Sequence, residues 1–169
     1  MQDSDRLSCI FYFSINLKTK NLNLILQAKQ HLMTPTHIEH IGIAVKDLDE
    51  SIAWYEKVLG LKCYAMEEVK EQRVRTAFFM VGETKIELLE STDPEGPIGK
   101  FIEKKGEGIH HIAYAVKGLE NMLAEVEANG VQLIDKIPRK GAEGLSIAFL
   151  HPKSTGGVLT ELCENKNEM

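Results

Sequence analysis

The apolar and polar residues of this chain alternate in short segments that predict strands and helices in a regular order. Residues 37–46 alternate and then become apolar, which indicates a strand. A helix is expected next, because Asp47 and Glu50 have the spacing of a capping box and Gly60 can end the helix. The strands expected after this helix are 61–66, 74–81 and 84–89. The first half of the chain therefore predicts a βαβββ module.

The second half predicts the same elements in the same order. Asp93–Pro97 is rich in turn-forming residues and indicates a linker, followed by a short helix over 98–105. A strand is then expected over Ile109–Val116, and the helix after it ends near Asn129 and Gly130. The remaining strands expected are 131–137, 146–150 and 158–163. The predicted fold class is α+β, with two tandem βαβββ modules whose curved mixed sheets surround a shared cleft.

The domain organisation follows from these elements. We expect residues 37–165 to act as one domain to which both modules contribute. The expected segments are a poorly ordered N-terminal extension over 1–36, the first module over 37–92, a linker with a short helix over 93–107, and the second module over 108–169.

The two modules also share residues, and the shared positions indicate where chemistry is expected. His40 and His111 correspond at an offset of 111 − 40 = 71 residues, and Glu87 and Glu161 at an offset of 161 − 87 = 74. Each histidine shares its strand face with glycine or alanine, so both have space around them. Each glutamate lies in an apolar run, where a buried carboxylate is unfavourable unless it is paired or bound to a metal. The alternative is that strand alternation points both carboxylates into solvent.

Four such side chains predict that the shared cleft binds a metal ion. Two neutral imidazoles and two carboxylates would balance the charge of a divalent cation and leave positions open for a substrate. The absence of thiolate ligands favours a catalytic ion (Co, Mn, Zn, Ni, Mg or Fe) over a closed structural zinc site. His110 is expected to point to the opposite strand face from His111, with a role in packing or at the surface.

The composition narrows the class of partner. The chain carries a formal net charge of −5, which argues against nucleic acid or a membrane as its partner. The three cysteines have no CxxC spacing, so no disulfide framework is indicated and a reducing, cytoplasmic compartment is expected. The apolar run Cys9–Ile15 is too short to span a membrane, and two acidic residues precede it where a secretory signal would be positive.

Three segments resemble a known family. They are His40-Ile41-Gly42-Ile43-Ala44-Val45, Gly108-Ile109-His110-His111-Ile112-Ala113, and the stretch from His151-Pro152-Lys153 to Glu161-Leu162. These segments are similar to those of the methylmalonyl-CoA epimerase family, a branch of the vicinal oxygen chelate superfamily that is built from paired βαβββ modules. The resemblance covers about residues 37–165.

This resemblance implies a metal-dependent epimerase that interconverts (R)- and (S)-methylmalonyl-CoA by proton transfer at C2 through a metal-stabilised enolate. His40, His111 and Glu161 match the metal ligands of that family, and Glu87 matches its fourth ligand position. Some members carry a glutamate base where this chain has Thr76, whose hydroxyl cannot act as that base. Glu87 and Glu161 are therefore also the candidate groups for proton transfer.

The resemblance further implies an acyl-CoA substrate and a homodimer. Arg139, Lys140 and Lys153 are candidates to bind the phosphates or the free carboxylate of that substrate. Two other functions stay open: a glyoxalase I-type lactoylglutathione lyase, which uses the same metal pattern, and a metal-free small-molecule-binding protein of the same fold. An extradiol dioxygenase would use three ligands with ferrous iron, so four candidate ligands disfavour it.

Overall fold

The computed structural model describes residues 34–166, so the predicted extension over 1–36 lies outside the described residues except at its end. The strands are β1 (His37–Val45), β2 (Cys63–Val69), β3 (Val74–Val81), β4 (Thr84–Ser91), β5 (Gly108–Ala115), β6 (Arg139–Lys140), β7 (Ser146–Leu150) and β8 (Leu159–Glu164). The helices are α2 (Leu48–Leu59), α3 (Pro97–Lys105) and α4 (Leu119–Ala128), with 3-10 turns at Lys70–Gln72, Ala142–Gly144 and Pro152–Ser154.

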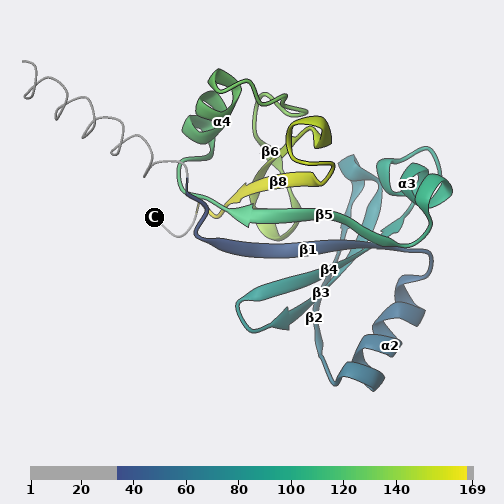
Figure 1. Ribbon diagram of the computed structural model, residues 1–169. Coiled ribbons are helices and arrows are strands. Elements are labelled where there is room, and N and C mark those ends of the chain that lie inside the picture. Colours follow the sequence, from purple (N-terminus) through teal and green to yellow (C-terminus); the bar gives the residue numbers. More distant parts are fainter. Residues whose placement is uncertain (1–33, 167–169) are drawn as a thin grey trace, which may run out of the picture. The chain divides into compact units, whose positions relative to one another are not determined.

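All eight strands belong to one mixed sheet in the order β2-β3-β4-β1-β5-β8-β7-β6. The first four positions come from the first module and the last four from the second. β1 and β5 pair antiparallel at the centre, while β4 runs parallel to β1 and β8 runs parallel to β5. The sheet curves into a half-barrel, as Figure 1 shows. The predicted α+β class, with paired modules and curved mixed sheets, is confirmed.

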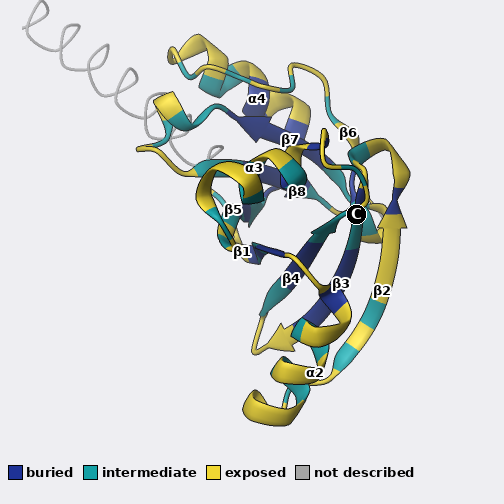
Figure 2. Cartoon of the chain, turned by 90° about the vertical axis from the view of Figure 1, so that its right-hand side faces the viewer, coloured by how far each residue is buried: buried dark blue, intermediate teal, exposed yellow. Residues whose placement is uncertain are grey.

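Strand alternation divides the side chains of the sheet between two faces. On β3, Ala77 and Phe79 are fully buried and pack with Leu48 of α2 on the outer face. Their neighbours Thr76 and Phe78 point to the inner face, where they line a cavity. Burying a phenylalanine of this kind stabilises the fold by about 1.5–3 kcal/mol. Figure 2 shows buried residues along β3 and β4, whereas β2 is mostly exposed.

The helix ends are capped by residues that the repeat places at equivalent positions. Asp47 accepts a hydrogen bond from the backbone N of Glu50 at 2.8 Å, as the capping-box spacing predicts. The backbone N of Leu48 also donates to Glu90, the last glutamate of β4, at 3.2 Å. α4 begins after Gly118 without a capping side chain of its own, and Glu164 of β8 accepts from the backbone N of Gly118 instead. α2 and α4 are therefore each tied to the final strand of their module.

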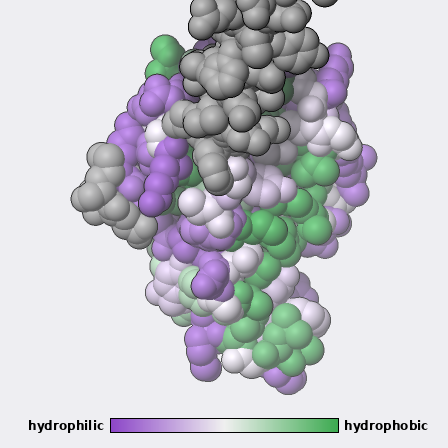
Figure 3. Space-filling model, turned by 60° about the vertical axis from the view of Figure 1, so that its left-hand side comes forward, coloured by the Kyte–Doolittle hydropathy of each residue, from purple (hydrophilic) through white to green (hydrophobic). Residues whose placement is uncertain are grey.

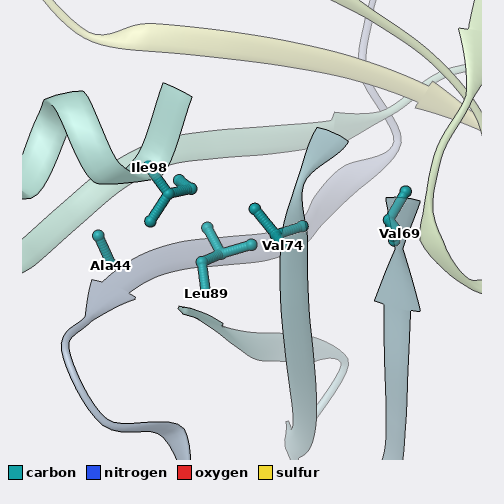
Figure 4. Packing of buried hydrophobic residues seen from close by; sticks show 5 residues of the cluster. All are labelled: Ala44, Val69, Val74, Leu89 and Ile98. Carbon is teal, nitrogen blue, oxygen red and sulfur yellow. The ribbon is translucent and has the colours of Figure 1, made fainter. Parts of the chain in front are cut away.

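The inner face of the first module holds a separate apolar cluster beneath α3. Its buried members come from four strands and the helix, and Figure 4 shows them: Ala44, Val69, Val74, Leu89 and Ile98. α3 begins with Pro97 at its first turn, where a missing N–H is tolerated, and Gly106 follows its last residue. Pro97 and Ile98 also line the cavity, so α3 forms part of its wall.

The strand predicted over residues 131–137 is wrong. The structure has only an isolated bridge between Leu133 and Leu150 there, and the outermost strand is the two-residue β6. The side chain of Asp135 explains the difference, because its carboxylate accepts from the backbone N of Phe149 at 2.9 Å. A side chain thereby takes a hydrogen bond that a strand would have supplied from its backbone.

Two further findings concern the described part of the chain. Cys63 and Cys163 are both free thiols. Between residues 34 and 166, no helix combines the length and the apolar character that crossing a membrane requires.

Candidate metal centre

Four buried polar side chains meet on the inner face of the sheet. They come from the four adjacent central strands, one from each: Glu87 of β4, His40 of β1, His111 of β5 and Glu161 of β8. Each is only 4–5% exposed to solvent. The predicted alternative, in which the two carboxylates point into solvent, is therefore excluded.

The contact atoms of the four side chains lie close together. His40 Nε2 and His111 Nε2 are 2.9 Å apart. The Oε2 atom of Glu87 lies 3.3 Å from His40 Nε2 and 3.6 Å from His111 Nε2. The Oε2 atom of Glu161 lies 3.8 Å and 3.2 Å from the same two nitrogens. Two nitrogens and two oxygens thus surround one point.

Gly42 creates the space that the His111 ring occupies. A Cβ atom at position 42 would lie 2.2 Å from Cε1 of that ring, far inside van der Waals contact. The φ angle of Gly42 is not positive, so the backbone does not require glycine there. The small residue is needed because the ring of the opposite strand lies against the backbone. This agrees with the space that the sequence predicts around the histidines.

A β-bulge precedes each of the two histidines. In the pairing of β1 with β5, Glu39 is skipped before His40, and His110 is skipped before His111. A bulged residue no longer follows the alternation of its strand, so its side chain can be turned toward the following one. Glu39 contacts His40 Nδ1, and His110 Nδ1 lies 2.9 Å from His111 Nδ1.

The prediction that His110 points away from His111 is accordingly wrong. The bulge cancels the alternation on which it was based, and His110 lines the cavity. Its ring also packs edge-on against Phe101 at 5.0 Å between centroids, so a packing role is present as well. Burial and the charge of His111 lower the pKa of His110 to about 3, so its ring stays neutral.

The pKa values around His40 describe a strongly negative site. Burial alone would lower the pKa of His40, but the hydrogen bond to Glu39 and the nearby carboxylates raise it to about 9. Burial alone would likewise raise the pKa of Glu39, but His40 and Lys85 outweigh it and lower the value to about 2. Burial raises the pKa of Glu87. A field that holds a proton on a buried imidazole also attracts a metal cation.

The chemistry of this donor set fits a divalent metal ion. Among residues 34–166, His40, His111 and Glu161 place one ligand atom each within 4.8 Å of the others, and Glu87 lies beside them. The Nδ1 atoms of both histidines have partners of their own, which leaves both Nε2 atoms directed at the centre. Imidazole and carboxylate ligands without thiolates suit Zn, Co, Ni or Mn.

The centre opens into a cavity of about 460 Å³. Its walls include Thr76, Phe78 and Phe149, together with the predicted substrate residues Arg139 and Lys140. The third predicted substrate residue, Lys153, is not among the residues that line it. Thr76 is buried, and its hydroxyl donates to the backbone oxygen of Glu67 at 3.4 Å.

Sequence reasoning missed four residues around the centre: Glu39, Lys85, His110 and Glu143. The positions of Glu39 and His110 had a usable signal, because each directly precedes a repeated histidine at the same offset of 110 − 39 = 71 residues. Lys85 and Glu143 had no such signal in the sequence, because their contact joins residues that are 58 positions apart.

Residues 39–149 match the Glyoxalase/Bleomycin resistance protein/Dioxygenase superfamily, and the chain belongs to it. Its relatives include the uncharacterized protein YqjC of Bacillus subtilis, 47% identical over 78% of this chain and 94% of that protein. The mitochondrial methylmalonyl-CoA epimerase of Homo sapiens is 34% identical over 74% of this chain and 72% of its own length.

A solved structure extends the likeness to three dimensions. The methylmalonyl-CoA epimerase of Streptomyces coelicolor, in complex with 2-nitronate-propionyl-CoA, matches with a TM-score of 0.76 and 37% identity. The match covers 79% of this chain and 96% of that one. Epimerases of this kind are isomerases, and the family resemblance predicted from the sequence is confirmed.

Proposed function

We propose that this chain is a metal-dependent epimerase that interconverts (R)- and (S)-methylmalonyl-CoA by proton transfer at C2. The observation that carries the proposal is the set of four buried donors, two from each module, in the wall of a cavity of about 460 Å³. The methylmalonyl-CoA epimerases among its relatives support the choice of substrate.

His40, His111, Glu161 and Glu87 would hold the ion. A divalent cation bound there would act as a Lewis acid toward the thioester oxygen and stabilise the negative charge that develops when C2 loses its proton. The four residues would hold the ion at the cavity wall, where apolar side chains such as Phe78 and Phe149 also lie.

Epimerisation needs one group to remove the proton from C2 and another to return it on the opposite face. Glu87 and Glu161 are the carboxylates at the centre, and we assign proton transfer to them. A carboxylate that holds the ion has its lone pair engaged, so each of these residues would act as a base only after releasing the ion. Thr76 lies in the wall and its hydroxyl donates a hydrogen bond to the backbone oxygen of Glu67, so it stays outside this assignment.

Arg139 and Lys140 are the cations proposed to bind the substrate. Both line the cavity in a chain whose formal net charge is −5, so they supply local positive charge for an anionic ligand. Arg139 lies over the Phe149 ring at 5.3 Å, which directs its guanidinium along the cavity wall. Lys153 is a weaker candidate because it does not line the cavity.

The experiment that tests this function follows deuterium from solvent into C2 of methylmalonyl-CoA. We expect rapid exchange with metal-loaded protein, slow exchange after chelation, and recovery when Co²⁺ is restored. The absence of metal-dependent exchange would exclude the epimerase. Consumption of methylglyoxal in the presence of glutathione would instead support a lactoylglutathione lyase.

The oligomeric state and the compartment stay predictions. We propose a homodimer in the cytoplasm, which sedimentation and cell fractionation can test. Apolar side chains do reach the surface, as Figure 3 shows for one face. Trp54 and Val58 of α2, at 51% and 57% exposure, are candidates for a contact between subunits.

A further inference from the structure

A line of charged contacts connects the two modules beside the candidate metal centre. The Lys85 ammonium donates to Glu39 and, at 2.7 Å, to Oε2 of Glu143. The other carboxylate oxygen of Glu39 contacts His40 Nδ1. Glu143 belongs to the second module, whereas Lys85, Glu39 and His40 belong to the first. The contacts therefore begin in the second module and end at a ligand histidine of the first.

Glu143 is held in place by three contacts with the first module. Besides Lys85, its carboxylate accepts from the Tyr64 hydroxyl at 3.0 Å, and its backbone N donates to Glu67 at 2.9 Å. Glu143 has a φ of 51°, in the left-handed region that costs a side-chain-bearing residue about 1–2 kcal/mol. The contacts with the first module offset this cost and hold the turn in a conformation that it would not favour by itself.

The turn that carries Glu143 is part of the cavity wall. Ala142, Glu143 and Leu145 line the cavity, directly after Arg139 and Lys140. We call residues 139–145 the rim segment. Lys85 therefore contacts two parts of the protein at once: the carboxylate of Glu39 beside His40, and the rim segment that lines the cavity.

We propose that Lys85 and Glu143 are positioning residues that hold Glu39 against His40 and thereby couple the rim segment to the metal centre. The inference rests on the proposed metal-binding function. Lys85 is shared by two carboxylates, so it fixes the direction in which Glu39 faces His40. Glu143 acts one step further out, by keeping Lys85 in its place.

The test measures Co²⁺ binding by calorimetry and the visible absorption of bound Co²⁺, both of which are independent of turnover. Lys85→Met should weaken Co²⁺ binding about 10- to 100-fold and change the spectrum, the range seen when outer-shell partners of metal ligands are lost. Lys85→Arg keeps a donor for both carboxylates and should restore affinity to within about threefold. Lys136→Met is the matched control, because Lys136 pairs with Glu127 at 2.9 Å on the surface, and it should change neither readout.

A double-mutant cycle measures the coupling between Glu143 and Lys85. Glu143→Ala should weaken Co²⁺ binding in the wild-type background and have no further effect in the Lys85→Met background. Equal losses in both backgrounds would show that Glu143 acts independently of Lys85 and would overturn the coupling. Should Lys85→Met fail to fold by circular dichroism, Glu143→Ala and Lys85→Arg carry the test.

The outcomes separate this inference from the proposed function. If the wild-type protein binds Co²⁺ and exchanges deuterium while Lys85→Met behaves like wild type, only the positioning role fails. If the wild-type protein binds no Co²⁺ at all, both the metal-dependent function and the inference fail.

Discussion

Replacing Gly42 by alanine tests the geometry of the centre with a single methyl group. The added Cβ would lie 2.2 Å from Cε1, 2.5 Å from Nδ1 and 2.8 Å from Nε2 of His111, whereas ordinary contact begins at 3.4 Å. The ring would therefore have to move by at least 3.4 − 2.2 = 1.2 Å along that line. Phe149 and His40, with ring centroids 5.4 Å and 5.0 Å away, restrict that movement.

The magnitudes follow from this displacement. Overpacking a buried site costs about 1–3 kcal/mol of unfolding free energy. A ligand nitrogen moved by about 1 Å leaves the window of roughly 0.2 Å that metal coordination tolerates, so metal affinity should fall about 10- to 100-fold. Urea unfolding of the metal-free protein measures the first effect, and calorimetric titration with Co²⁺ measures the second.

The matched control is the same substitution in a His111→Ala background, where the obstructing ring is absent. Because the φ of Gly42 suits alanine, Gly42→Ala should there stabilise the protein, by about 0.4–1 kcal/mol. The sign of the effect on stability thus reverses between the two backgrounds. Equal effects of Gly42→Ala in both backgrounds would refute the explanation that the glycine accommodates the ring.

Three more predictions concern ligation, pH and substrate. His111→Ala should abolish both Co²⁺ binding and deuterium exchange, and retained exchange would remove His111 from the ligand set. The pKa of His40 is raised to about 9, so its stabilising effect is complete below about 6.5 and is lost as pH rises through 9. Urea unfolding of the metal-free protein should therefore show that the unfolding free energy falls by on the order of 3 kcal/mol over this pH range. Co²⁺ affinity should rise over the same range. An unfolding free energy that does not change with pH would contradict the raised pKa. Arg139→Ala should raise KM for methylmalonyl-CoA with a smaller change in kcat, and an unchanged KM would remove Arg139 from the substrate site.

The parts of the fold that the sequence predicts well are those with a long local pattern. The caps at Asp47 and Gly60 formed as expected, because every group that decides them lies within a few residues. The segment 131–137 did not form its strand, because the carboxylate of Asp135 bonds to Phe149 on a strand 14 residues away. A local pattern of apolar residues does not indicate that a side chain will replace a backbone hydrogen bond of the strand.

In the candidate site, the residues that both modules share were predicted, and those without a counterpart in the other module were not. Duplication indicated which histidines and glutamates come together without any knowledge of distances. The bulges at Glu39 and His110 were not predicted, because one extra residue in a strand reverses the rule that assigns side chains to faces. The contact between Lys85 and Glu143 depends on how the two modules pack, and neither residue has a counterpart in the repeat to mark it.

The division of the four donors between the modules has an evolutionary consequence. A single module supplies one imidazole and one carboxylate, fewer than the three protein ligands that a catalytic zinc ion usually has. An unduplicated ancestor would have needed two identical chains to assemble the same centre, and its activity would have vanished on dilution. Joining the copies in tandem would replace that encounter by an intramolecular one at a fixed effective concentration. Fusion would also free each copy to diverge. His40 has the anionic Glu39 as its neighbour, whereas His111 has the neutral His110. A symmetric dimer of identical chains could not have acquired this difference.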